Sequence, residues 1–171
     1  MKLQIKLGFW LLIGILSCPV IFPFRSYAQK SSLEKSDIRI RLTRGGDVVQ
    51  FGSTKATLIA AFGKPQSIEK YTFETLNEKG ELITYNGNNF YFIKDKLMGF
   101  EVANNMFSVG LQSTGVYNTI GSDLKTLPAT NHITKDSAEL DITVGGKEWD
   151  EKLIFYLGPD KKVVLIRHWS G

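Results

Sequence analysis

Hydrophobic and polar residues alternate in two stretches of the chain, and this pattern is typical of a β-strand with one buried face. Ile38, Ile40 and Leu42 alternate with arginines, and residues 138–144 repeat the pattern with acidic partners. Four apolar runs in the remainder also predict strands: 90–93, 97–102, 153–157 and 163–169. Turn residues separate the members of each pair, so we expect two hairpins. The Asn86-Gly87 pair adds either a further hairpin or a bulge before Phe90.

A helical pattern lies between these strands, with signals for its start and its end. Leu58, Ala61 and Phe62 share one face at helical spacing. Ser53 or Thr54 can cap the first turn, because a hydroxyl accepts from a free backbone N–H. Gly63 favours the residue that ends a helix, and Pro65 follows two residues later. The sequence therefore predicts a helix of about two and a half turns.

The turn before this helix recurs later in the chain. Phe51-Gly52-Ser53 is matched by Ile120-Gly121-Ser122, and a leucine follows each turn within a few residues. Pro128 would cut the second helix short. We therefore predict an α+β fold of two tandem repeats, each with a glycine turn, a helix and about three antiparallel strands. The predicted divisions are a signal peptide at 1–28, a tether and strand at 29–46, repeat 1 at 47–117 and repeat 2 at 118–171.

The first 28 residues have the layout of a secretory signal peptide. Lys2 and Lys6 precede an apolar run, and Ser26-Tyr27-Ala28 supplies small residues for cleavage. Two alternatives stay open. Cys18 could be acylated as in a lipoprotein, or the leader could be retained, because its apolar stretch approaches the length of a membrane span.

Removal of this leader changes the charge of the chain. The whole sequence has a formal net charge of +4, but the leader contains three basic residues and no acid, which leaves 18 basic and 17 acidic residues. No basic footprint for nucleic acid remains. The remaining chain also contains no cysteine, so we expect neither a disulfide nor a thiolate metal cluster.

Catalytic motifs are sparse in this sequence. His132 and His168 are the two histidines, and Asp136 is an acid near the first of them. A metal site needs several converging ligands, so we expect no metal and no cofactor. The chain contains neither the G-x-S-x-G pattern of a nucleophile elbow nor a phosphate-binding loop.

Aromatic residues on the predicted strands are better candidates for a binding surface. Trp149 stands among charged residues, and it either binds a partner or folds back onto the core. A sheet face rich in tyrosine suits protein contacts, because the ring packs while the hydroxyl forms hydrogen bonds. The candidate binding residues are Tyr85, Tyr91, Trp149, Tyr156, Arg167 and His168.

The succession of Phe51-Gly52-Ser53, a short helix ending in Phe62-Gly63-Lys64-Pro65 and a meander resembles a known fold. It is similar to the outer-membrane assembly lipoprotein BamE (SmpA/OmlA) and to the tandem-repeat β-lactamase inhibitory proteins. The resemblance covers Val49 to Trp169 and implies a module that binds other macromolecules on a concave sheet. Those inhibitors carry disulfides, which this chain lacks after its leader.

The resulting hypothesis is a non-enzymatic, protein-binding module in the periplasm, the cell envelope or the medium. Membrane contact would come only through a retained leader or an acylated Cys18. Two alternatives are a small-ligand or lipid carrier, which needs an enclosed apolar pocket, and a hydrolase that uses a histidine and a nearby acid.

Overall fold

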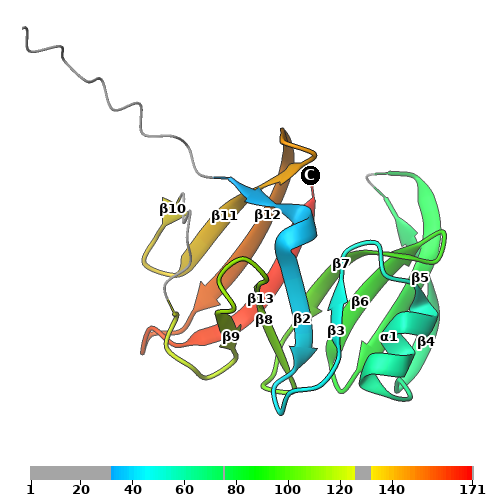
Figure 1. Cartoon of the computed structure of the whole chain (residues 1–171), viewed down its shortest axis with the longest axis horizontal. Coiled ribbons are helices and arrows are strands. Elements are labelled where there is room, and N and C mark those ends of the chain that lie inside the picture. Colours follow the sequence, from blue (N-terminus) through cyan, green and yellow to red (C-terminus); the bar gives the residue numbers. More distant parts are fainter. Residues whose placement is uncertain (1–31, 75, 126–131, 171) are drawn as a thin grey trace, which may run out of the picture.

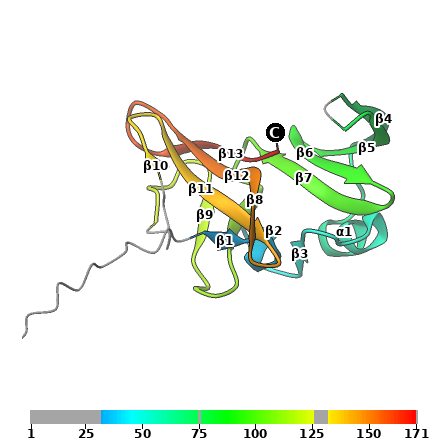
Figure 2. The same ribbon diagram turned by 90° about the horizontal axis from the view of Figure 1, so that it is seen from above.

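Two β-sheets packed face to face form most of the structure, a computed structural model that describes residues 32–74, 76–125 and 132–170. The large sheet has nine strands in the order β1-β11-β12-β13-β7-β6-β5-β4, with β10 paired to β11. The small sheet has the order β3-β2-β8-β9. Figure 2 shows the large sheet lying across the small one, with α1 beneath its β4 end. The predicted leader, with Cys18, lies outside the described residues.

The elements follow in chain order, and all strand pairs except β1 with β11 are antiparallel. They are β1 (Leu33–Glu34), the 3-10 turn η1 (Lys35–Asp37), β2 (Ile38–Leu42), β3 (Val48–Gln50), α1 (Lys55–Phe62), β4 (Ser67–Phe73), β5 (Glu78–Tyr85), β6 (Asn88–Ile93), β7 (Lys96–Val102), β8 (Phe107–Leu111), β9 (Tyr117–Thr119), β10 (His132–Ile133), β11 (Ser137–Val144), β12 (Lys147–Leu157) and β13 (Val163–Ser170).

The core lies between the two sheets. Ile38 and Ile40 point into it from β2, as their alternation with arginine predicts, and both are fully buried. Phe107 of β8 packs against Phe62 of α1 and Phe90 of β6, with ring centroids 4.8 and 5.2 Å apart. These large side chains belong to one continuous hydrophobic core that includes residues of both sheets.

The single α-helix among the described residues confirms the predicted helix and its caps. Thr54 accepts a hydrogen bond from the N–H of Thr57 at 3.1 Å, and the N–H of Gly63 donates to Ile59 at 2.8 Å. Leu58 and Phe62 are buried on one face of the helix. The pattern of caps and apolar spacing was therefore sufficient to locate α1.

The predicted α+β fold of two helix-plus-meander repeats is wrong. The described chain is mostly β-structure, and only the first glycine turn leads into a helix. After Gly121, Asp123 forms a β-bridge with Lys162 and the N–H of Lys125 donates to Asn118. These bonds direct residues 121–125 along neighbouring strands, where no helical turn begins. Pro128 and part of the expected second helix lie outside the described residues.

The two glycine turns nevertheless make the same backbone hydrogen bonds. The N–H of Gly52 donates to Leu97 at 2.9 Å, and the N–H of Gly121 donates to Val163 at 2.8 Å. In return, Leu97 and Val163 donate to the carbonyls of Ser53 and Ser122. Both glycines have positive φ, 79° and 84°. Each turn is thereby fixed to the first residues of a strand, β7 or β13.

The short strand β1 is held to the large sheet by its own side chain. Glu34 accepts hydrogen bonds from the N–H of Gly145 at 2.8 Å, from Gly146 at 3.3 Å and from the Thr143 hydroxyl at 3.0 Å. The bond from Gly145 is the strongest influence on Glu34, and it lowers the pKa of this carboxyl. Glu34 therefore connects the start of the described chain to the β11–β12 turn.

Candidate interaction surface

One face of the large sheet points away from the small sheet, and we call it the outer face. Tyr91, Tyr156 and Arg167 lie on it, because their neighbours Phe90, Phe155 and Ile166 point into the core and side chains alternate along a strand. The register confirms this arrangement, since Arg167 pairs with Ile154, two residues before Tyr156. The structure thus brings three of the six candidate residues onto one face.

An aromatic cluster covers the β4 end of the outer face. It consists of Tyr71 and Phe73 of β4 and Tyr91 of β6, with ring centroids 4.9, 5.2 and 6.2 Å apart. Gly80 lies beneath Phe73 and Gly99 lies beside Tyr91, so the rings pack close to the backbone. Tyr71 is 38% exposed, so the cluster is accessible to a partner.

A polar contact adjoins this cluster. The Nε of Arg167 lies 3.7 Å from Oε2 of Glu101, which pairs with Asn89 on the neighbouring strand. Burial raises the pKa of Tyr91, and the nearby charge of Glu101 adds to this effect, while Arg167 opposes it. Tyr91 is therefore a neutral hydrogen-bonding group at physiological pH.

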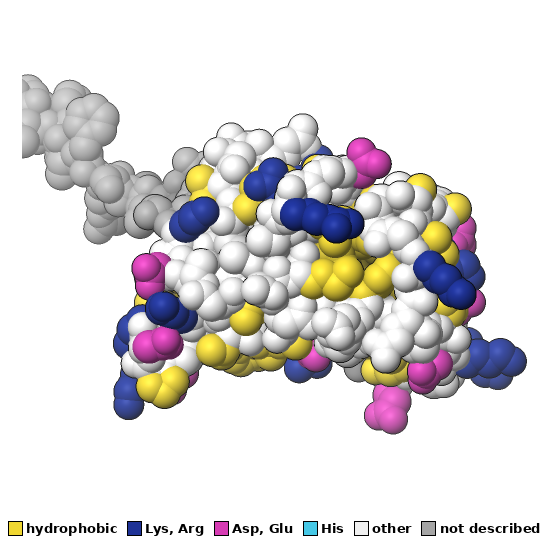
Figure 3. Space-filling view, turned by 90° about the horizontal axis from the view of Figure 1, so that it is seen from below, with side chains coloured by type: hydrophobic (Ala, Val, Ile, Leu, Met, Phe, Trp, Pro, Cys, Tyr) yellow, Lys and Arg dark blue, Asp and Glu magenta, His cyan; other side chains and the backbone are white. Residues whose placement is uncertain are grey.

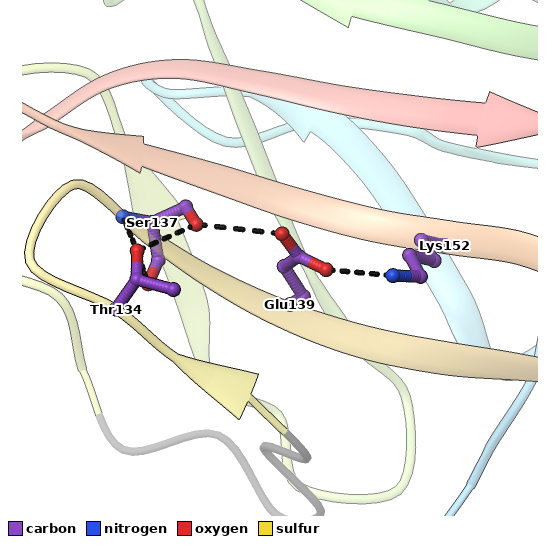
Figure 4. A network of polar contacts seen from close by, with 4 residues as sticks. All are labelled: Thr134, Ser137, Glu139 and Lys152. Atoms are coloured by element: carbon purple, nitrogen blue, oxygen red, sulfur yellow. Dashed lines mark hydrogen bonds and ion pairs between the residues drawn. The ribbon is translucent and has the colours of Figure 1, made fainter.

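A second polar network lies on the outer face at the β11 end (Figure 4). Lys152 Nζ donates to Glu139 at 2.8 Å, and the Ser137 hydroxyl approaches the other oxygen of Glu139 at 3.5 Å. The hydroxyl of Thr134 accepts from the N–H of Ser137 at 2.9 Å. The hydrogen bond to Glu139 raises the pKa of Lys152. The outer face thus changes from aromatic at β4 to charged at β11 and β12.

Tyr85 lies on the opposite face of the sheet from Tyr91. Its ring is 3% exposed, and its hydroxyl donates to the carbonyl of Gly63 at 2.8 Å. Burial raises the pKa of Tyr85 to about 12. The turn at Asn86-Gly87 joins β5 to β6 with Tyr85 opposite Asn88, and this register directs Tyr85 into the core. Tyr85 therefore stabilises the end of α1 and is not available to a partner.

His168 is also buried, at 7% exposure, on the core side of β13. Its ring centroid lies 4.6 Å from that of Phe51, and its Nε2 lies 3.0 Å from Oε2 of Glu151. Lys35 reaches the same oxygen at 2.6 Å. Burial is the main influence on the imidazole and lowers the pKa of His168. His168 is therefore a neutral donor to Glu151 at physiological pH.

Trp149 is 58% exposed, so its side chain does not fold back onto the core, which was one of the two alternatives from the sequence. It lies near the start of β12, after the Gly145-Gly146 turn. Among the described residues, no ring contact joins it to the aromatic cluster. Sequence reasoning missed Tyr71, Phe73 and Glu101 as partners of Tyr91. The two-residue spacing of Tyr71 and Phe73 indicates that they share one face of a strand, and this spacing was the sequence signal that could have identified them.

The surface of the described residues includes two open depressions of note. One, of about 740 Å³, lies beside η1 and is lined by polar residues such as Arg39 and Gln112. The other, of about 410 Å³, lies between α1 and β4. Figure 3 shows the molecule from below relative to Figure 1, with hydrophobic side chains gathered near the middle of this face and no histidine visible on it. Both depressions are open to solvent, whereas the carrier alternative needs an enclosed apolar pocket.

The described part of the chain shows no arrangement typical of a metal centre or a membrane-spanning helix. It holds no group of three or more His, Cys, Asp and Glu side chains placed to bind a metal ion. None of its helices has the length and apolar character needed to cross a membrane. The exposed His132 in β10 and the buried His168 belong to separate regions of the large sheet.

Comparisons with protein-family models, with curated proteins and with solved structures find no match to this chain. The resemblance to BamE and to the β-lactamase inhibitory proteins therefore stays a prediction.

Proposed function

We propose that this protein is a non-enzymatic, extracytoplasmic module that binds another protein through the outer face of the large sheet. The observation that carries the proposal is the aromatic cluster of Tyr71, Phe73 and Tyr91, which is accessible on a sheet face beside the Arg167–Glu101 pair. Tyrosine and arginine are enriched at the energetic centres of protein interfaces.

The geometry of the cluster supports a macromolecular partner. The rings come from two strands joined through β5 and contact one another edge to face, so their positions are fixed before binding. Fixed side chains lose little conformational entropy when a partner covers them. The outer face also continues across several strands to Tyr156, which gives room for an interface of ordinary size.

The extracytoplasmic location rests on the sequence of the leader. Residues 1–28 have the basic start, apolar run and small residues of an export signal. The mass of the intact protein from the cell tests this part of the proposal, because it separates cleavage after Ala28, acylation at Cys18 and retention of the leader.

Quantitative capture of proteins from envelope extracts tests the binding face. A Tyr91→Ala/Arg167→Ala variant should lose at least one partner that the unaltered protein captures, with a decrease of about 30-fold in affinity for the purified partner. Trp149→Ala is the matched control, because it removes an exposed aromatic side chain outside the cluster. Because Tyr91→Ala can also lower stability, Tyr91→Phe/Arg167→Glu provides a milder second variant. Equal capture by all of these proteins would contradict the proposed face.

A further inference from the structure

Strand β4 is a long open edge of the large sheet. It pairs with β5 on one side and has no strand on its other side among the described residues. Its five central residues are exposed. The other end of this sheet is β1, with two residues, and the small sheet ends in β3 and β9, with three residues each. Unpaired backbone groups on an edge of this length can receive another strand.

A shallow apolar groove lies beside this edge. The depression of about 410 Å³ between α1 and β4 is lined by Ile59, Pro65 and Ile68, together with Gly63 and Lys64. Ile68 is 45% exposed. Figures 1 and 2 place β4 at the margin of the sheet, with α1 along its core side. A strand added to β4 would therefore direct every second side chain toward α1 and the groove.

The charges on β4 define what such a strand should carry. Glu69 and Lys70 are adjacent, so their side chains point to opposite faces of the sheet, and neither forms an ion pair with a described residue. Opposite charges that face each other across two strands are stabilising, and like charges are destabilising. A strand that complements β4 would thus carry an acidic residue opposite Lys70, a basic residue opposite Glu69 and an aliphatic residue beside Ile68.

The edge is continuous with the surface of the proposed function. Tyr71 and Phe73 belong to β4 and also to the aromatic cluster on the outer face. An added strand would place a side chain next to Tyr71 on that face, so edge and face would be covered together.

We infer that β4 binds an extended segment of the partner protein by strand addition, with an acidic residue opposite Lys70 and an aliphatic residue in the groove at Ile68. This inference rests on the proposed protein-binding function and adds the chemical character of the bound segment. Main-chain hydrogen bonds to β4 would supply affinity, and the charge pairs would select the register.

A designed peptide tests the inference with the full chain. The sequence Ser-Thr-Phe-Glu-Lys-Val-Thr-Ser runs antiparallel to β4 and places Glu opposite Lys70, Lys opposite Glu69 and Val opposite Ile68. With a fluorescent label, it should bind the protein in an anisotropy titration. Bound peptide should also slow deuterium exchange of the amides of 67–73, measured by mass spectrometry, and leave the amides of β11 unchanged.

Charge reversal then tests the register. Lys70→Glu should weaken binding about tenfold, because an attractive pair becomes repulsive. A peptide with its Glu replaced by Lys should bind this variant more tightly than it binds the unaltered protein. Lys147→Glu, on the distant β11–β12 hairpin, makes the same change in net charge and should leave affinity unchanged. Lys70 also lies opposite Glu81 of β5, so the preference of the variant for the Lys peptide, and not weaker binding alone, decides the register. The inference fails if the two peptides do not discriminate between the variants.

A second copy of the chain is the competing occupant of the edge. A dimer in sedimentation velocity that Lys70→Glu alters, together with no peptide binding, would assign the edge to self-association and overturn the inference. The proposed function is tested separately, because equal capture by the unaltered protein and the Tyr91→Ala/Arg167→Ala variant would reject the binding face itself. Partner capture that depends on Tyr91 and Arg167 but is unaffected by Lys70→Glu would retain the binding face and reject strand addition.

Discussion

The Nε2 atom of His168 lies 3.0 Å from Oε2 of Glu151, at a place where the imidazole is almost completely buried. An ionised carboxylate only accepts hydrogen bonds, so this nitrogen carries the proton of a neutral ring. Burial tends to raise the pKa of Glu151, but the hydrogen bonds from His168 and Lys35 outweigh it, and the pKa of Glu151 is lowered. The group in the native protein is thus a carboxylate, an ammonium and a neutral imidazole.

This group makes stability depend on pH. Both His168 and Glu151 have a native pKa below the usual one, so the unfolded chain binds protons more readily and stability is lost as pH falls. The contribution of His168 is present above its usual pKa of 6.5 and decreases below it, and that of Glu151 decreases below its usual pKa of 4.5. Urea unfolding from pH 8 to pH 4 measures the effect. His168→Gln should make the unfolding free energy depend less on pH below pH 6.5. An unchanged pH dependence in this variant would contradict the lowered pKa of His168.

Tyr85 should ionise only at strongly alkaline pH. Its pKa is raised to about 12 by burial, and its hydroxyl donates to Gly63. In a spectrophotometric titration at alkaline pH, Tyr85→Phe should remove a component with a midpoint of about 12. The same variant should lose about 1 kcal/mol of unfolding free energy, because the carbonyl of Gly63 loses its buried donor. Tyr156→Phe, on the outer face, is the control and should change neither quantity appreciably.

The two glycine turns should be sensitive to any side chain with a β-carbon. Gly52→Ala and Gly121→Ala should each lower the unfolding free energy by about 1 kcal/mol, because both positions have positive φ. Asparagine visits this region more readily than other residues, so Gly121→Asn should lose less than Gly121→Ala. Denaturant midpoints check the order, and an alanine variant as stable as the asparagine variant would show that φ is not the constraint.

Removing a buried aromatic side chain should cost much more unfolding free energy than removing an exposed one. Phe107 is fully buried among Phe62, Tyr85 and Phe90, whereas Trp149 is largely exposed. Phe107→Ala should lower the unfolding free energy by about 3–5 kcal/mol through lost contacts and a cavity. Trp149→Ala should change it by about 0.5 kcal/mol or less. Comparable losses in the two variants would mean that Trp149 packs against the fold.

Local parts of the fold could be predicted from the sequence where one residue pattern decides one element. Ile38 and Ile40 identify the buried side of β2, and Thr54, Leu58 and Gly63 define α1. The second predicted helix failed for a physical reason. A helix needs a costly first turn, and the six residues from Ser122 to Leu127 give fewer than two turns before Pro128. Bridge pairing at Asp123 decides the local structure instead.

Pairings between distant strands could not be predicted in the same way. The contact of β13 with β7, Ile166 opposite Val102, joins the two halves of the large sheet and leaves no periodic signal in either segment. For the same reason, the sequence could not predict which of the candidate binding residues lie on the surface. Tyr91 and Arg167 share a face because of that pairing, whereas Tyr85 and His168 point into the core because of registers that only the folded chain defines.

The attachment of β1 through Glu34 has a practical consequence for experiments that immobilise the protein. β1 and β4 are the opposite margins of the same sheet, separated by seven strand-to-strand steps in the order of the large sheet. At about 4.8 Å per step this is roughly 34 Å measured along the sheet. A tether joined ahead of Leu33 would therefore hold the molecule at the β1 margin and leave the β4 margin facing the solution. Protein immobilised in this way should bind ligands at β4 without steric hindrance from the support.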